Sequence, residues 1–186
     1  MPPTTALIAR LVRIDEDLTR PLTLPENPRL PRLLALGLAH SGDSYIWAGL
    51  LVAAWFLGDA PGSYSWKARA IMIFAGLVVT ELVTVAVKMA IRRPRPAGTA
   101  GAVYRRVDPF SFPSGHAARA VMLCILAYLM GPWAGFFAIL AWSPFMVLSR
   151  IAIGIHYVFD VVAGAVMGAL LTWALWAAVP LVLARI

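Results

Sequence analysis

The sequence has little charge. Asp, Glu, Lys and Arg make up only 13% of its 186 residues, whereas 61% are hydrophobic and the mean hydropathy is +0.79. A water-soluble domain of this length could not bury so much apolar surface, which excludes the soluble fold classes and makes lipid part of the solvent. We therefore expect an integral membrane protein.

Cysteine and acidic residues are also scarce. The one cysteine, Cys124, lies inside an apolar stretch, which excludes a framework of disulfides within the chain. The 16 Lys and Arg exceed the 9 Asp and Glu, and the net charge is +7. The arginines gather in loops and at the ends of apolar segments, where they suit anionic lipid headgroups better than nucleic acid. We expect the lipid bilayer as a partner and no nucleic acid, and the sequence carries no signal for an oligomeric state.

The N-terminal part differs in composition from the rest. Residues 1–30 contain 5 prolines and mixed charges without a long apolar core, so we expect no cleavable signal peptide. Within them, residues 5–18 place apolar and charged side chains on opposite helical faces, which predicts a helix lying on the membrane surface. We expect an interfacial helix with a Pro-rich connector over 1–31 and a transmembrane domain over 32–186.

Apolar segments in the second part predict the membrane spans. Four are clear, each close to the roughly 20 residues that a helix needs to cross the hydrocarbon core, and they cover 69–91, 114–131, 133–149 and 157–179. The first candidate, 33–57, is interrupted by the polar stretch 40–44, so it is either one broken span or an interfacial piece followed by a short span. Because backbone inside lipid must bond to itself, we expect an all-α, polytopic transmembrane helical bundle with five spans, or with six as the alternative.

Three short stretches carry residues suited to phosphate chemistry. They are Lys88 with Arg95-Pro96, the run Pro113-Ser114-Gly115-His116, and Ser149-Arg150 with His156 and Asp160. Since successive spans alternate in direction, the loop 92–113 and the junction 149–157 lie on the same face of the membrane. We expect all three stretches to converge on that face.

The last of these stretches is suited to nucleophilic catalysis. His156 and Asp160 are four residues apart and therefore share one helical face. A carboxylate there can accept the Nδ1 proton, which leaves Nε2 of His156 free to attack phosphorus. Arg150, together with Lys88 and Arg95, supplies the positive charge that holds a phosphate and its transition state.

The middle stretch is suited to binding an anion and donating a proton. Ser114 is a good N-cap, and Gly115 lets the backbone approach a ligand closely. Free N–H groups at such a helix start form an anion site. His116, beside that site, is placed to protonate a leaving oxygen.

These stretches resemble the three signature motifs of the type 2 phosphatidic acid phosphatase (PAP2) superfamily, which also contains the vanadium haloperoxidases. The resemblance covers about residues 80–170 and includes every motif position. It implies that His156 forms a phosphohistidine, that His116 protonates the leaving group and that Asp160 orients the nucleophile. It further implies that no cofactor or metal is needed and that phosphate is bound by Lys88, Arg95, Ser114, Gly115 and Arg150.

The expected activity is therefore metal-independent removal of phosphate from a membrane lipid. The resemblance implies polyprenyl diphosphates, such as undecaprenyl diphosphate, or glycerolipid phosphates, such as phosphatidic acid or phosphatidylglycerophosphate. One alternative is a phosphatase or phosphotransferase for a soluble phosphate ester. The other is a non-enzymatic, anion-binding transporter, which would need a continuous polar path through spans that contain few polar residues.

Three residues outside the motifs carry further expectations. Arg119 lies one helical turn after His116, and we expect it to contact a second phosphate or the lipid headgroup; the alternative is snorkelling or pairing with an acidic neighbour. Glu81, two turns before Lys88, either pairs with Lys88 or makes an ordinary polar helix contact. His40 matches no motif position, and we expect it to be structural.

The distribution of basic residues predicts a cytoplasmic active site. With five spans, the N-terminus and the motifs share a face, and the opposite face carries only Lys67, Arg69 and Arg185. The motif face carries nine arginines beyond the phosphate-binding set: Arg10, Arg13, Arg20, Arg29, Arg32, Arg92, Arg93, Arg105 and Arg106. We expect a bacterial or archaeal cell membrane, although many bacterial members of the resembled family act on the outer face.

Overall fold

The computed structural model describes residues 3–27, 29–56, 66–98 and 108–183, so Arg105, Arg106 and Arg185 lie outside the described residues. Within these ranges the elements are helices, with no β-strand, which confirms the expected all-α fold. The elements are α1 (Pro3–Thr19), the short 3-10 helix η1 (Arg20–Leu22), α2 (Leu30–Ser41), α3 (Ser44–Phe56), α4 (Trp66–Ile91), α6 (Gly115–Met130), α7 (Trp133–Ala152) and α8 (Val158–Leu183).

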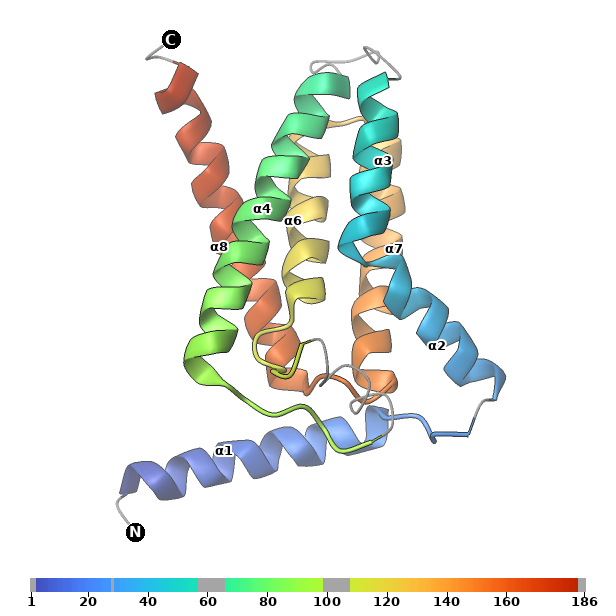
Figure 1. Ribbon diagram of the computed structural model, residues 1–186, viewed down its shortest axis with the longest axis vertical. Coiled ribbons are helices and arrows are strands. Elements are labelled where there is room, and N and C mark those ends of the chain that lie inside the picture. The colour runs from blue at the N-terminus through green and yellow to red at the C-terminus, as the bar shows by residue number, and fades with distance from the viewer. Residues whose placement is uncertain (1–2, 28, 57–65, 99–107, 184–186) are drawn as a thin grey trace.

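The helices form an up-and-down bundle (Figure 1). Helices α4, α7 and α8 are long and apolar enough to cross a membrane, and α3 and α6 are shorter apolar helices beside them. With α3 following α2 across a break, these helices coincide with the five apolar segments from which the sequence predicts spans. The motif-bearing ends of α4, α6, α7 and α8 all lie at the same end of the bundle.

The first span is divided into two helices. α2 ends at Ser41 and α3 begins at Ser44, and α2 tilts away from the other spans (Figure 1). The carbonyl of Asp43 accepts the N–H of Ile46 at 3.1 Å, so Asp43 begins the hydrogen bonding of α3. Its side chain is therefore held at the joint between the two helices, where it faces the bundle interior.

Helix α1 lies across the motif end of the bundle (Figure 1). Its apolar residues Leu7 and Ile8 are about three-fifths exposed, at 58% and 62%, as expected of a helix on a membrane surface. Its other face is buried at Asp15 and Thr19, which accept hydrogen bonds from the first N–H groups of α8. Helix α1 thus caps the helix that carries Asp160.

Helices α6 and α8 pack closely through two glycines of α8. A Cβ atom on Gly164 would lie 2.3 Å from the carbonyl oxygen of Ser114, and one on Gly168 would lie 2.2 Å from that of Ala118. Two small residues four apart are typical of membrane helices whose backbones approach directly. This contact fixes the start of α6, with its Ser-Gly-His run, against the start of α8.

Candidate active site

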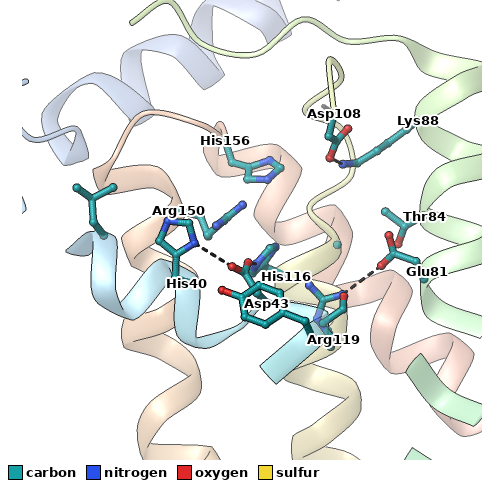
Figure 2. A pocket seen from close by; sticks show the side chains of 14 residues that line it. His40, Asp43, Glu81, Thr84, Lys88, Asp108, His116, Arg119, Arg150 and His156 are labelled. Carbon is teal, nitrogen blue, oxygen red and sulfur yellow. Dashed lines mark hydrogen bonds and ion pairs between the residues drawn. The ribbon is translucent and has the colours of Figure 1, made fainter. Parts of the chain in front are cut away.

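The three motifs surround one cavity of about 560 Å³ at the motif end of the bundle. Its volume is in the range of small-molecule sites. Figure 2 shows side chains from α2, α4, α6 and α7, and from the junctions beside them, pointing into it. The predicted site residues on its wall are Lys88, Gly115, His116, Arg119, Arg150 and His156. The other three, Arg95, Ser114 and Asp160, lie directly behind this wall and contact it.

His156 and Asp160 lie together at the start of α8. His156 precedes the first helical residue, and its Nδ1 lies 3.5 Å from Oδ2 of Asp160, both side chains being buried. That separation is an ion-pair distance, and Nδ1 makes no hydrogen bond to the described residues. Catalytic hydrogen bonds often shorten only in the complex with substrate. Asp160 is held by the backbone N–H of Tyr157 at 2.9 Å and by Arg93 at 2.8 Å.

The other ring nitrogen of His156 faces the cations. Nη1 of Arg95 lies 3.4 Å from Nε2, and because a guanidinium can only donate, Nε2 must carry a lone pair. Burial, followed by the charges of Arg95 and Arg150, lowers the pKa of His156 well below its usual value. His156 is therefore a neutral imidazole whose Nε2 lone pair faces the positive end of the cavity.

The two cations of the first motif share an acidic partner that the sequence analysis missed. Nζ of Lys88 and Nη2 of Arg95, the latter at 2.8 Å, both bind Oδ2 of Asp108. Arg95 also donates to the carbonyl oxygens of Asp108 at 2.7 Å and of Ile155 at 2.8 Å. A carboxylate oxygen thus lies between the two cations expected to hold phosphate. No spacing rule in the sequence indicated Asp108.

The start of α6 is built as an anion site. Ser114 is its N-cap, and its Oγ accepts from the N–H of Ala117 at 3.4 Å. The N–H of Ser114 donates to the carbonyl oxygen of Asp160 at 2.9 Å, which ties the second motif to the third. A Cβ on Gly115 would lie 3.3 Å from Cγ2 of Thr84, so a side chain there would be crowded against α4.

His116 has a partner that the motifs did not predict. Its Nε2 lies 2.9 Å from Oδ1 of Asp43, and Oδ2 of Asp43 lies 2.8 Å from Nδ1 of His40. These two residues belong to the polar interruption that the sequence analysis noted but did not assign to the site. The interruption was the one available signal, since polar residues inside an apolar span are usually functional.

Arg119 is buried and lines the cavity, as its position on α6 predicted. Its Nη1 pairs with Oε2 of Glu81 at 3.1 Å, and its Nε donates to the carbonyl oxygen of Gly42 at 3.1 Å. Arg119 therefore pairs with an acidic neighbour, which was the alternative to a headgroup contact in the sequence-based expectation. Glu81 pairs with Arg119, while Lys88 pairs with Asp108.

Arg93, counted above as a surface charge, is an interior link instead. Its Nη1 lies 2.6 Å from Oδ2 of Asp15 and 2.8 Å from Oδ1 of Asp160, and its guanidinium lies 3.9 Å from the ring centre of Tyr157. It thereby connects helix α1 to the carboxylate beside His156. Arg92 and Arg95 lie close to it in sequence, so the charge pattern did not distinguish it.

Comparison with known proteins identifies the family of the chain. The family model of the PAP2 superfamily matches residues 69–183. A decaprenylphosphoryl-5-phosphoribose phosphatase of Mycobacterium tuberculosis is 34% identical over 141 residues, which cover 73% of this chain and 73% of that protein. A probable lipid phosphate phosphatase beta of Arabidopsis thaliana is 26% identical, over 89% of this chain and 88% of its own length.

A solved structure shows the same fold. The transmembrane PAP2-type phosphatidylglycerolphosphate phosphatase of Bacillus subtilis superposes with a TM-score of 0.70 and 21% identity, over 90% of this chain and 85% of that one. The family match spans more than half of the chain, and it includes all three motifs around the cavity. The chain therefore belongs to the PAP2 superfamily and is a membrane-embedded phosphatase.

Proposed function

We propose that the protein removes phosphate from a membrane lipid through a phosphohistidine at His156, without a metal. The observation that carries this proposal is the buried, neutral imidazole of His156, whose Nε2 lone pair lies 3.4 Å from Arg95. A phosphate held by Arg95 is thereby brought next to the nucleophile. Asp160, 3.5 Å from Nδ1, stabilises the positive charge that develops on the ring.

The reaction has two steps. In the first, Nε2 of His156 bonds to phosphorus while the P–O bond to the lipid breaks, and His116 gives a proton to the leaving oxygen. In the second, water attacks phosphorus, its proton passes to His116, and the P–N bond breaks to release phosphate. The N–H groups at the start of α6, with Ser114 and Gly115, stabilise the transition-state oxygens.

Fixed cations take the electrostatic role that a metal has in other phosphatases. The three cations are buried, with at most 8% of each residue exposed: Lys88, Arg95 and Arg150. Their charges therefore act in a site with little water to screen them. Each of them contacts or lines the cavity around His156. Activity should therefore be unchanged by a metal chelator such as EDTA.

In the bound substrate, the lipid tail would extend out of the cavity along α3 and α4. Tyr45 and Glu81, on these two helices, line the cavity. Farther along the same helices lies an apolar groove of about 410 Å³, lined by residues that include Val52 and Phe74. A polyprenyl or acyl chain would lie in this groove, with Arg119 near the headgroup or a second phosphate. Relatives named for polyprenyl and other lipid phosphates support this substrate class.

Phosphate release from a lipid panel tests the proposal. The panel contains a polyprenyl monophosphate, a polyprenyl diphosphate, phosphatidic acid and phosphatidylglycerophosphate, with glucose 6-phosphate as a soluble ester. We expect EDTA-resistant release from at least one lipid and loss of about 1,000-fold or more in His156→Ala. Release from the soluble ester alone, or full activity of His156→Ala, would contradict it.

A further inference from the structure

The break between α2 and α3 is fixed against the catalytic helices. Arg119 of α6 donates to the carbonyl oxygen of Gly42 at 3.1 Å, and Trp142 of α7 donates to Oγ of Ser41 at 2.8 Å. The break is outside the region matched by the family model, which begins at residue 69. Its side chains nevertheless have defined positions on the cavity wall.

Asp43, at this break, joins two histidines (Figure 2). Its Oδ1 lies 2.9 Å from Nε2 of His116, and its Oδ2 lies 2.8 Å from Nδ1 of His40. An ionised carboxylate only accepts hydrogen bonds, so each of these ring nitrogens carries a proton. The side chain of His40 is 52% exposed, whereas those of Asp43 and His116 are only 17% and 14% exposed.

The contact determines which nitrogen of His116 can act on substrate. A Cβ on Gly42 would lie 2.9 Å from Cδ2 of His116, so the Cδ2–Nε2 edge of the ring lies against the break. Nδ1 is on the opposite side of the ring, away from Asp43. With Nε2 occupied, Nδ1 is the atom that can transfer a proton.

Asp43 also balances charge. Full protonation of His116 would place a positive charge among the cations of the cavity, which disfavours that state. Among the residues that the structure describes, Asp43 is the acidic residue that contacts the imidazole ring of His116. The other charged or titratable groups that line this cavity are His40, Tyr45, Glu81, Lys88, Asp108, Arg119, Arg150 and His156.

We propose that Asp43 is the positioning residue of the general acid, holding His116 through Nε2 so that Nδ1 protonates the leaving oxygen, with His40 securing Asp43 from outside. The proposal rests on the proposed role of His116. In the first step the Nδ1 proton passes to the bridging oxygen as the P–O bond breaks, and the lipid leaves as a neutral alcohol. The water that later cleaves the P–N bond returns a proton to Nδ1.

Two substrates with different leaving groups test this proposal in the full-length protein. Short-chain phosphatidic acid releases an alkoxide that needs a proton, whereas p-nitrophenyl phosphate releases a stable phenolate that does not. We expect Asp43→Asn to lower kcat/KM, which reports the first step through release of the leaving group, by about 10- to 100-fold for phosphatidic acid and by less than about threefold for p-nitrophenyl phosphate. Equal losses on both substrates would overturn the proposal.

Control variants separate this outcome from failure of the proposed function. His116→Ala should be selective in the same way, and equal losses there would remove the general-acid role itself. His156→Ala should lose activity on both substrates, because the nucleophile is needed whatever the leaving group.

A second readout does not depend on turnover. The chain has three histidines, so ring ¹⁵N spectra of the histidine-labelled protein in detergent contain few signals. We expect His116 to show a protonated, hydrogen-bonded Nε2 that changes in Asp43→Asn, while the signals of His156 are retained. An unchanged His116 spectrum in a folded Asp43→Asn protein would also overturn the proposal.

Discussion

At the scale of single residues, Asp108 occupies the position between the two cations that we propose to bind substrate phosphate. Its carboxylate bridges Lys88 and Arg95, the two cations of the first motif. A phosphate oxygen can form the same charge-assisted bonds, so substrate and Asp108 compete for these cations. In the proposed mechanism, substrate phosphate would displace the Asp108 carboxylate from these cations.

Replacing Asp108 should strengthen anion binding. We expect Asp108→Asn to tighten inhibition by orthovanadate or inorganic phosphate by about threefold to tenfold, because one competing negative charge is removed. Inhibition constants measured at fixed ionic strength check this. Asp17→Asn, an exposed change on α1 with the same effect on net charge, serves as the control. Weaker inhibition in Asp108→Asn would mean that Asp108 supports the cations instead of competing for them.

The charge state of His156 predicts how its titration differs from that of an exposed histidine. Burial and the neighbouring arginines lower its pKa below the usual 6.5, so the nucleophilic neutral form persists as the pH falls through that value. We expect the ring signals of His156 to titrate well below pH 6.5. Titration of His156 at or above pH 6.5 would show that the cations do not act on it.

The sequence predicted contacts between site residues that are close in the chain, and it missed contacts between residues that are far apart in the chain. His156 and Asp160 are four residues apart, so local spacing predicted their proximity, although His156 lies just before α8 and not on its helical face as the sequence suggested. Asp43 and His116 are 73 residues apart, and their contact depends on where a broken helix docks. The same holds for Asp15, which reaches Arg93 only because α1 lies across the bundle. Long-range pairs of this kind leave no spacing pattern in the chain.

At the scale of elements, the site depends on how closely α6 and α8 pack. Gly164 and Gly168 of α8 allow its backbone to touch the start of α6. This contact holds the first turn of α6, which carries His116, beside the first turns of α8, which carry Asp160. Apolar periodicity predicted both helices but could not indicate this contact. Hydropathy likewise could not decide between one span and two pieces around residues 40–44, because the break is held by tertiary hydrogen bonds.

Adding a methyl group at this contact should separate the helices. We expect Gly168→Ala to destabilise the protein by about 1–3 kcal/mol and to lower activity, since its Cβ would meet a backbone carbonyl at 2.2 Å that cannot move aside. Thermal unfolding in detergent measures the effect. Gly135→Ala on α7 is the matched control, because no heavy atom lies within 4 Å of a Cβ there. Equal stability of the two variants would contradict the packing argument.

At the scale of the whole molecule, the bundle brings every motif to one end, where α1 also lies (Figure 1). The apolar stripe of α1 is exposed, and Asp15 on its other face accepts a hydrogen bond from the start of α8. Helix α1 therefore contacts both the expected membrane surface and the helix that carries Asp160. Anionic lipid and substrate headgroups would meet the protein at this end. The charge asymmetry predicts which side of the membrane this end faces.

The excess of arginine at the motif end predicts a cytoplasmic site. Single cysteines replacing Asn27, near the motif end, and Lys67, at the opposite end, in a Cys124→Ser background, report the orientation. We expect an impermeant maleimide to label Lys67→Cys in intact cells and Asn27→Cys only after permeabilisation. The reverse pattern would place the active site outside.

The covalent intermediate at His156 is the central claim, and trapping it is the most direct test. The purified protein is mixed with a ³²P-labelled lipid phosphate, quenched in alkali within milliseconds, digested and sequenced by mass spectrometry. The mechanism predicts alkali-stable, acid-labile phosphate on His156, absent from His156→Ala and more abundant in a variant with slower hydrolysis. Turnover with no phosphate on His156 at any time, or continued turnover in His156→Ala, would contradict it.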